Sequence, residues 1–390
     1  MAVILQQLYD GIREKEKIDL VAGAGGMDHE VRWVHMVEDA CISDFLEGEE
    51  IAFTTGVALA SSEKLLELVQ FNYQKKASGM VINIGPYIKE ISQEIIDFAN
   101  AHDFPIFAVP WKVHMANIMR YFSMEITLDE QKNLEFSSAL KNALYFSDNE
   151  EMYVPTFLKY GYKKEWSYCI AVMELQDRTY NCAKERERKK MFRILQHSLR
   201  AYKEYIMLQE IDEEFVFFCN NYKEEKVQIV LQQIWEEVQI YVPAGHRMYA
   251  GVGRTMKNIH EVGKCYRQAL QVKKMQWKIH NKNKFVMYSK LGVRKLLLAI
   301  DNEEIIQEYY EECLGALERY DHINETDYYY FLQQYFKLDC SAQQVARELH
   351  LHRNSVTYKL HKCEEIIGVD IASQENRTKL IVAFMLKEIQ

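Results

Sequence analysis

Paired cysteines are absent from this sequence, although cysteine itself is not rare. The 390 residues contain eight cysteines, and no two of them stand in a C-x-x-C pair. This scatter is typical of reduced, buried thiols and argues against a zinc module or a disulfide framework. We therefore expect neither a metal site nor a cofactor. The cysteines are Cys41, Cys169, Cys182, Cys219, Cys265, Cys313, Cys340 and Cys363.

Long apolar runs are also missing. No stretch approaches the roughly 20 apolar residues that cross a bilayer. The opening segment, MAVILQQLYDGIREKEK, mixes acids with bases and has no small-residue cleavage site, so we do not interpret it as a signal peptide. We expect a cytoplasmic protein that does not bind membranes.

An excess of positive charge is the third absence, since the net charge is −9. A protein that coats nucleic acid with its whole surface is basic, so any contact with nucleic acid has to be local here. Apolar residues make up 48% and charged residues 27% of the chain, which is a globular composition. The length suffices for two or three domains.

Residues 1–125 alternate strand-like and helix-like patterns, which predicts an α/β domain with parallel strands. The strands are expected at 31–37, 50–56, 79–85 and 104–110, and the helices at 61–77 and 89–101. The GAGG cluster that begins at Gly23 is expected to be a loop.

The ends of two of these strands carry small and polar residues. Ligands of such sheets bind where a strand ends and the next helix begins. We therefore predict that this edge binds a small effector, with ordinary turns as the alternative interpretation. The predicted effector-binding residues are Thr54, Thr55, Gly56, Asn83 and Gly85.

Residues 126–165 read as a helical connector with an irregular apolar stripe. Pairing of subunits and packing into a core both fit this stripe.

Residues 166–290 predict a ferredoxin-like α+β domain with an antiparallel hairpin in its middle. Strands are expected at 166–175, within 204–219, at 246–253 and at 284–288, and helices at 183–204, 223–240 and 257–278. The segment resembles the GGDEF/nucleotide-cyclase fold, with IDEEF at 211–215 in the place of that family's signature hairpin.

The hairpin departs from that family, because side chains stand where two glycines let the backbone close on a nucleotide. Glu174 or Asp177 could pair with Glu213 or Glu214 and hold metal ions. A solvated acidic turn is the interpretation we favour, so we expect a catalytically silent domain.

Residues 291–390 predict an all-α domain with a helix-turn-helix over 341–368. Ser341 is placed to cap the first helix, with Gln344 three residues later, and Ala346 leaves room where the two helices cross. Asn354 or Ser355 is expected to cap the second helix, 354–367, which Gly368 ends. Its single apolar stripe is Val356, Leu360, Cys363 and Ile367.

The opposite face of the second helix offers hydrogen-bonding side chains. Between 347 and 362 four basic residues face one acid, a local charge of +3 in a chain of −9. This combination favours contact with DNA bases and phosphates. The predicted DNA-binding residues are Arg353, Asn354, Ser355, Thr357, Tyr358, Lys359 and Lys362, with auxiliary contacts from His352 and His361.

This region has two other interpretations, a metal site and an ordinary helical hairpin. A metal site of His350, His352 and His361 fails because their side chains diverge on a helical projection. An ordinary helical hairpin is the stronger rival, but capping, packing and charge together favour DNA binding.

The C-terminal quarter closely resembles the PucR family of bacterial transcription regulators. The resemblance rests on the run LGALERYD, the core ARELHLHRNSVTYKL and the exit IIGVDI. EGEEIAFTTG and GMVINIG resemble the same family's effector domain, and the middle resembles its degenerate GGDEF-like module. Departures at His350, Lys359 and Cys363 bear on the target sequence.

The resemblance implies a ligand-responsive, sequence-specific DNA-binding transcription regulator, which is not an enzyme. Its partners would be double-stranded DNA and a small effector, and it would act as a homodimer or higher oligomer. The resemblance also suggests purine catabolism or that of another nitrogen compound. A nucleotide cyclase-like enzyme with an added helical domain, and a protein-binding scaffold, are the alternatives.

Overall fold

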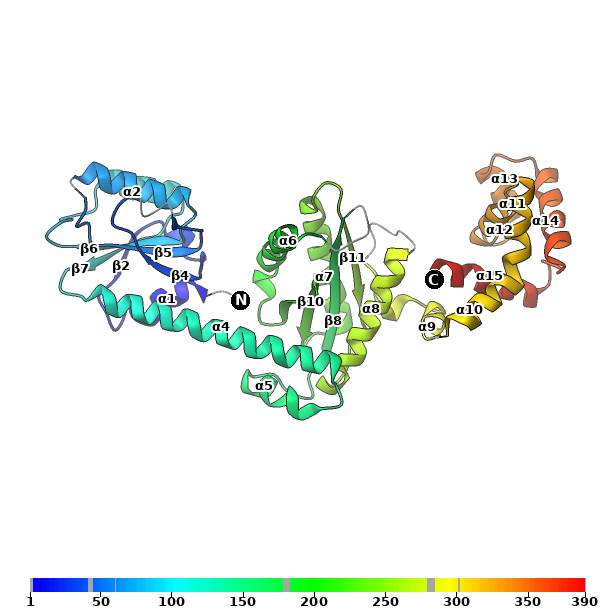
Figure 1. Cartoon of the computed structure of the whole chain (residues 1–390), viewed down its shortest axis with the longest axis horizontal. Helices are drawn as coiled ribbons and strands as arrows, with labels where there is room; N and C mark the ends of the chain where they lie inside the picture. Colours follow the sequence, from blue (N-terminus) through cyan, green and yellow to red (C-terminus); the bar gives the residue numbers. More distant parts are fainter. Residues whose placement is uncertain are drawn as a thin grey trace. The chain divides into compact units, whose positions relative to one another are not determined.

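The computed structural model describes residues 3–40, 45–59, 61–177, 183–278, 285–300 and 302–389. The chain divides into two compact units, Met1–Ser138 and Ala139–Gln390, and helix α4 (Met115–Tyr145) continues from the first into the second (Figure 1). Cys41 and Cys182 lie outside the described residues. Among the described helices, none combines the length and the apolarity that crossing a bilayer requires.

The first unit is built on a five-stranded sheet with the order β2-β7-β6-β5-β4. Four of its strands run parallel, and they are β4 (Trp33–Met36), β5 (Glu50–Thr54), β6 (Gly79–Ile84) and β7 (Ile106–Pro110). These match the strands expected from the sequence, because near-continuous apolar runs are typical of parallel strands buried on both faces. Strand β2 (Asp19–Ala22) lies antiparallel to β7 and was not anticipated.

Helices cover both faces of this sheet (Figure 1). Helices α2 (Ser62–Gln74) and α3 (Gln93–Ala101) pack on one face, and α1 (Leu5–Ile12) and the first half of α4 pack on the other. The strand expected at 31–37 is divided at Arg32 into β4 and the short β3 (Glu30–Val31), which pairs with β1 (Val3–Ile4). The alternation of inward-facing strand residues supplies both apolar layers.

The second unit begins, after α5 (Val154–Lys159), with the expected ferredoxin-like domain. Its elements follow the order β-α-β-β-α-β, and the antiparallel sheet has the order β11-β8-β10-β9. They are β8 (Tyr168–Gln176), α6 (Glu185–Ser198), β9 (Ile206–Ile211), β10 (Glu214–Asn220), α7 (Glu224–Val238) and β11 (Arg247–Val252), followed by α8 (Val262–Lys278).

The strand expected at 284–288 is wrong over 285–288, and residue 284 lies outside the described residues. Met287 makes one isolated bridge to Val252, and the chain then turns into a short 3-10 helix at Tyr288–Lys290. The segment is a run of four apolar residues, and such a short run does not by itself specify a ladder.

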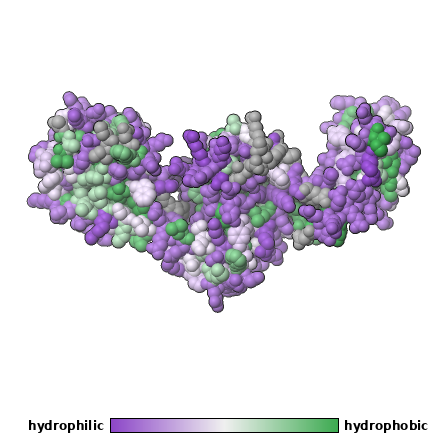
Figure 2. Space-filling model, in the orientation of Figure 1, coloured by the Kyte–Doolittle hydropathy of each residue, from purple (hydrophilic) through white to green (hydrophobic). Residues whose placement is uncertain are grey.

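The remainder of the second unit is helical in its described residues, as expected. Its helices are α9 (Arg294–Leu297), α10 (Glu303–Tyr310), α11 (Ala316–Asn324), α12 (Tyr328–Lys337), α13 (Ala342–Glu348), α14 (Arg353–Ile367) and α15 (Gln374–Ile389). One apolar cluster joins α10 to α15, with Leu317, Leu332, Val345, Val356 and Ala383 fully buried. The surface over these helices is largely hydrophilic in the view of Figure 2.

The acidic hairpin between β9 and β10 closes through a two-residue turn. Asp212 and Glu213 both take positive φ, 50° and 69°, which matches the right-handed twist of the flanking strands. The Tyr145 hydroxyl donates to Asp212 Oδ2 at 2.6 Å, and Arg188 Nη1 lies 3.3 Å from Glu213 Oε1. The turn therefore forms without glycine, and its acids are engaged by other side chains.

A lysine lies between the two acids that face each other on neighbouring strands. The Lys273 ammonium, on α8, forms ion pairs with Glu174 on β8 and Glu214 on β10, and its side chain is only 13% exposed. Burial acts to lower the pKa of Lys273, but the two carboxylates outweigh burial and raise it. The Tyr266 hydroxyl also donates to Glu214, at 3.2 Å. Of the acid pairs that the sequence left open, Glu174 and Glu214 are the two that meet, with a cation from the chain itself between them.

We predict that Lys273→Met lowers the free energy of unfolding of the middle domain by about 3–5 kcal/mol, because two largely buried carboxylates lose their shared cation. Urea unfolding measures the loss. Lys274→Met, at the exposed neighbouring position, is the matched control and should change stability by at most about 0.5 kcal/mol. Equal effects of the two substitutions would contradict a stabilising role for the lysine bridge.

Candidate nucleic-acid interface

Helices α13 and α14 form the helix-turn-helix that the sequence predicts. The Ser341 hydroxyl accepts a hydrogen bond from the Gln344 amide at 3.4 Å and caps α13 as expected. Val345 is fully buried, and Ala346 packs half-buried against the same apolar cluster. The Leu351 amide donates to the Ala346 carbonyl at 2.8 Å, which fixes the turn against the end of α13.

The turn places His350 in the left-handed region, with φ of 52°. A side chain with a Cβ is strained there, whereas glycine is not. The strain is local to the residue that reverses the chain between the two helices.

The cap of α14 differs from the expectation. His352, and not Asn354 or Ser355, is the capping residue, because its Nδ1 accepts a hydrogen bond from the Asn354 amide at 3.2 Å. The helix therefore begins at Arg353. An Nδ1 that accepts leaves the ring proton on Nε2.

The apolar stripe of α14 is confirmed. Val356 and Cys363 are fully buried, and Leu360 and Ile367 pack half-buried beside them. Burial raises the pKa of the Cys363 thiol to about 12, so this cysteine is an un-ionised core residue. Gly368, with φ of 73°, ends the helix in the left-handed conformation that favours glycine.

The outward face of α14 presents the predicted hydrogen-bonding residues to solvent. Asn354, Ser355, Thr357 and Tyr358 are exposed, the last with 64% of its surface. The Thr357 hydroxyl donates to the Arg353 carbonyl at 3.2 Å, so its oxygen remains able to accept. Arg353 is itself exposed at the start of the helix. This exposed edge therefore combines neutral hydrogen-bond donors and acceptors with the positively charged guanidinium of Arg353.

The two lysines of α14 are held by carboxylates of the same domain. The Lys359 ammonium forms an ion pair with Asp327, lies 5.0 Å from the centre of the Tyr328 ring and is 21% exposed. Lys362 Nζ lies 2.8 Å from Glu365 Oε2, and this hydrogen bond raises the pKa of Lys362. A phosphate that binds either lysine has to compete with a carboxylate already in place.

His352 and His361 make different contacts and do not meet at one site. His352 caps the helix, and His361 Nδ1 lies 3.0 Å from Glu364 Oε2 on the exposed side of α14. Within the described ranges, no three His, Cys, Asp or Glu residues gather as metal ligands would.

The first unit brings Thr54, Thr55 and Gly56 together around one carboxylate. Glu38 accepts from the Thr55 amide and the Gly56 amide, both at 3.0 Å, and from the hydroxyls of Thr54 and Thr55 at 3.1 and 2.7 Å. The sequence reading identified the donors but missed this acceptor. Its position directly after the strand at 31–37, at the same edge of the sheet, was the available indication.

The other two predicted effector residues are also engaged locally. The Asn83 side chain is buried and donates to the Val109 carbonyl at 3.2 Å. The Gly85 amide donates to the Ile88 carbonyl at 2.7 Å, and a Cβ on Gly85 would lie 2.7 Å from the Trp111 ring. Gly85 is therefore a site of close packing, beside an indole that is half exposed.

We predict that His350→Val lowers the free energy of unfolding by about 1–2 kcal/mol, because a β-branched residue is strained in the left-handed region. His350→Gly should not lower it. His361→Val, on the exposed helical surface, is the control and should lie within about 0.5 kcal/mol of the parent chain. Chemical unfolding of the full chain compares the three, and a His350→Gly loss equal to that of the valine variant would contradict the strain at this turn.

Comparison with known proteins gives three matches along the chain. Residues 12–126 match the purine catabolism regulatory protein-like family, 158–275 match a GGDEF-like domain, and 329–386 match the PucR C-terminal helix-turn-helix domain.

Three curated relatives come from Bacillus subtilis (strain 168). The proline-responsive transcriptional activator PutR is 26% identical over 36% of this chain and 34% of its own length. The purine catabolism regulatory protein is 30% identical over 33% of this chain and 24% of its own length. The DNA-binding transcriptional activator AdeR is 21% identical over 35% of this chain and 33% of its own length. The matched part thus spans about a third or less of each relative. From its three consecutive domains, the chain belongs to the family of PucR-type regulators, with a PucR N-terminal domain, a GGDEF-like middle domain and a PucR-type helix-turn-helix at its C-terminal end.

Proposed function

We propose that this protein is a cytoplasmic, effector-responsive transcription regulator that binds specific DNA through α14. The observation that carries the proposal is the exposed edge of Asn354, Ser355, Thr357 and Tyr358 on a helix whose opposite face is buried. A helix of this kind fits the major groove, where every base pair presents its own pattern of donors and acceptors.

The roles of individual residues follow from their chemistry. Asn354 has the amide that pairs in a bidentate manner with adenine, and the hydroxyls of Ser355 and Thr357 suit either bases or phosphates. Arg353 is proposed to contact a phosphate. Among the described residues, no carboxylate forms an ion pair with Arg353, so none has to be displaced first. Lys359 and Lys362 exchange a carboxylate for a phosphate, so each contributes less to affinity than a solvated lysine.

We further propose that an effector acts through the first unit, at the sheet edge of Thr54, Thr55 and Gly56, with Asn83 and Gly85 shaping the neighbouring strand end. Support comes from the convergence of two amides and two hydroxyls on the Glu38 carboxylate. The same donors suit an effector carboxylate that displaces Glu38. Because PutR responds to proline by its name and another relative is a purine catabolism regulator, we propose a nitrogen-containing metabolite.

We also propose that the protein acts as a homodimer or higher oligomer. Two copies of α14 spaced about 34 Å apart would read a repeated half-site one turn of DNA away.

The rival reading as a nucleotide cyclase-like enzyme lacks support at the hairpin. Lys273 lies between Glu174 and Glu214, where a metal ion would need both carboxylates. Side chains at Ile211 and Asp212 also stand where cyclases have their two glycines. We therefore propose a middle domain that transmits and does not catalyse.

We predict that Asn354→Ala combined with Ser355→Ala weakens binding to the DNA upstream of the protein's own gene about tenfold or more, because base contacts are lost. The same variant should lose much less affinity for unrelated DNA, because the charged phosphate contacts remain. Fluorescence anisotropy at several salt concentrations measures both.

Arg353→Ala should weaken binding to all sequences and reduce the salt slope by about 1, as the loss of one phosphate contact requires. Lys379→Ala removes the same charge from an exposed position on α15 and is the matched control. The proposal is wrong if the full chain does not bind the upstream DNA at low salt, or if binding is unaffected by both α14 variants.

A further inference from the structure

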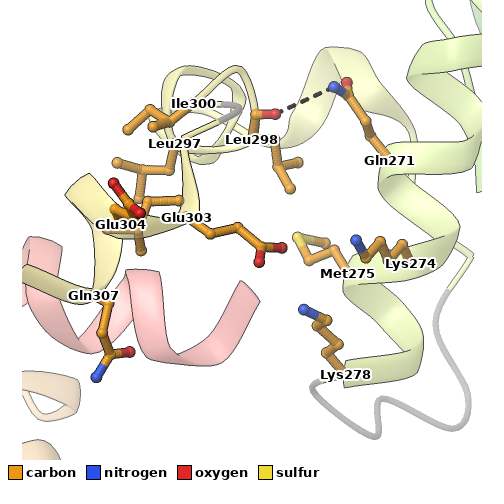
Figure 3. A pocket seen from close by; sticks show the side chains of 11 residues that line it. Gln271, Lys274, Met275, Lys278, Leu297, Leu298, Ile300, Glu303, Glu304 and Gln307 are labelled. Atoms are coloured by element: carbon orange, nitrogen blue, oxygen red, sulfur yellow. Dashed lines mark hydrogen bonds between the residues drawn. The ribbon is translucent and has the colours of Figure 1, made fainter. Parts of the chain in front are cut away.

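A cavity of about 620 Å³ lies between the middle domain and the helices that precede the helix-turn-helix. Helix α8 forms one wall, and the segment from Leu297 to Ile300 with the first turns of α10 forms the other (Figure 3). Both walls belong to the second unit. The volume is in the range of small-molecule sites in proteins. None of the residues discussed so far as DNA or effector contacts lines it.

Charges of both signs face this cavity without neutralising one another directly. Lys274 and Lys278 stand one turn apart on α8, and Glu303 reaches toward them from the start of α10 (Figure 3). Among the described residues, none of these three groups forms an ion pair within 4.0 Å. Burial and the charge of Lys274 lower the pKa of Lys278, and Glu303 opposes this only in part. Within the described ranges, neither lysine therefore has a carboxylate within 4.0 Å.

The floor between the charged walls is apolar. Met275, Leu297 and Ile306 are buried and belong to one cluster that also includes Leu386 of α15. The Gln271 amide nitrogen donates to the Leu298 carbonyl at 3.2 Å and ties the two walls together at one end (Figure 3). A ligand in the cavity would thus meet cations on one side, a carboxylate on the other and methyl groups beneath.

We propose that this cavity binds a small zwitterion with an apolar group, of the class of the aliphatic and aromatic α-amino acids. Its carboxylate lies between Lys274 and Lys278, its ammonium faces Glu303, and its side chain covers Met275 and Leu297. Each charge of such a ligand meets an opposite charge, and charge-assisted hydrogen bonds are the strong ones.

The balance of charge distinguishes this class from a nucleotide or another polyanion. Two lysines and two glutamates, Glu303 and Glu304, line the cavity, so its formal charge is zero. Several phosphates would lie in the field of both carboxylates, which repel negative charge.

Occupancy of the cavity would connect two elements with different tasks. Helix α8 packs on the sheet of the middle domain, whereas α10 leads into the helices that carry α14. A ligand held by both favours the arrangement in which they enclose it, in proportion to its differential affinity. This consequence for DNA rests on the proposed function, but the binding does not.

Isothermal titration calorimetry of the full chain tests the site with L-leucine and L-phenylalanine. We expect both to bind, and we expect 4-methylpentanoate and isopentylamine, which each lack one charge of leucine, to bind about tenfold more weakly or worse. No heat of binding from either amino acid at millimolar concentration would overturn the proposal. Equal affinity for leucine and its two analogues would overturn it as well.

Substitutions locate the site independently of the ligand series. Glu303→Gln, which preserves shape, and Lys278→Met should each weaken leucine binding about tenfold. Lys190→Met, on the exposed face of α6, removes an equal charge elsewhere and should leave binding unchanged. Leucine binding that survives both cavity substitutions would place the ligand elsewhere and overturn the assignment.

The result is separable from the proposed function. DNA affinity measured with and without leucine is a second experiment on the same protein. A chain that binds leucine but no DNA would overturn the proposed function and leave the cavity assignment in place. A chain that binds DNA but no amino acid would overturn the cavity assignment and leave the proposed function in place.

Discussion

Burial of the stripe that runs from Val356 to Cys363 determines what α14 can do. When one face of a helix is buried in a core, the residues on its opposite face are determined as well, because successive residues are 100° apart around the axis. Val356 and Cys363 enter the same cluster as Val345 of α13 and Leu332 of α12, so the turn between α13 and α14 is set by packing. The exposed polar edge follows from that commitment. The strained His350 and the imidazole cap at His352 are accommodated because the buried stripe fixes the helix on either side of them.

Local periodicity was sufficient to predict most of this architecture. The helix-turn-helix, four strands of the first sheet and the βαββαβ order of the middle domain all follow from apolar spacing over a few turns or strands. Strand β2 and helix α1 were missed because each is short and carries polar residues within its pattern. The expected strand at 284–288 failed for the opposite reason, since apolar residues alone do not supply a partner strand.

Contacts between residues distant in sequence could not be predicted in this way. Asp327 is 32 positions from Lys359, and Lys273 is 99 positions from Glu174. In a sequence, a lysine on a helix looks the same whether it is solvated or paired with an acid. Lys359 was therefore expected to be a solvated DNA contact, and the role of Lys273 was not noticed. The cap at His352 was missed for a chemical reason, because the Nδ1 of a histidine accepts a hydrogen bond only in the neutral tautomer that carries its proton on Nε2.

Glu38 gives the first unit a property that none of its donors has alone. A carboxylate attached to the same chain acts on the Thr54–Gly56 donors at the high effective concentration of a short tether, typically of millimolar order. Any other anion that binds at this edge has to compete with the Glu38 carboxylate for the same donors. If the proposed effector binds at this edge, it therefore has to reach a concentration high enough to displace Glu38.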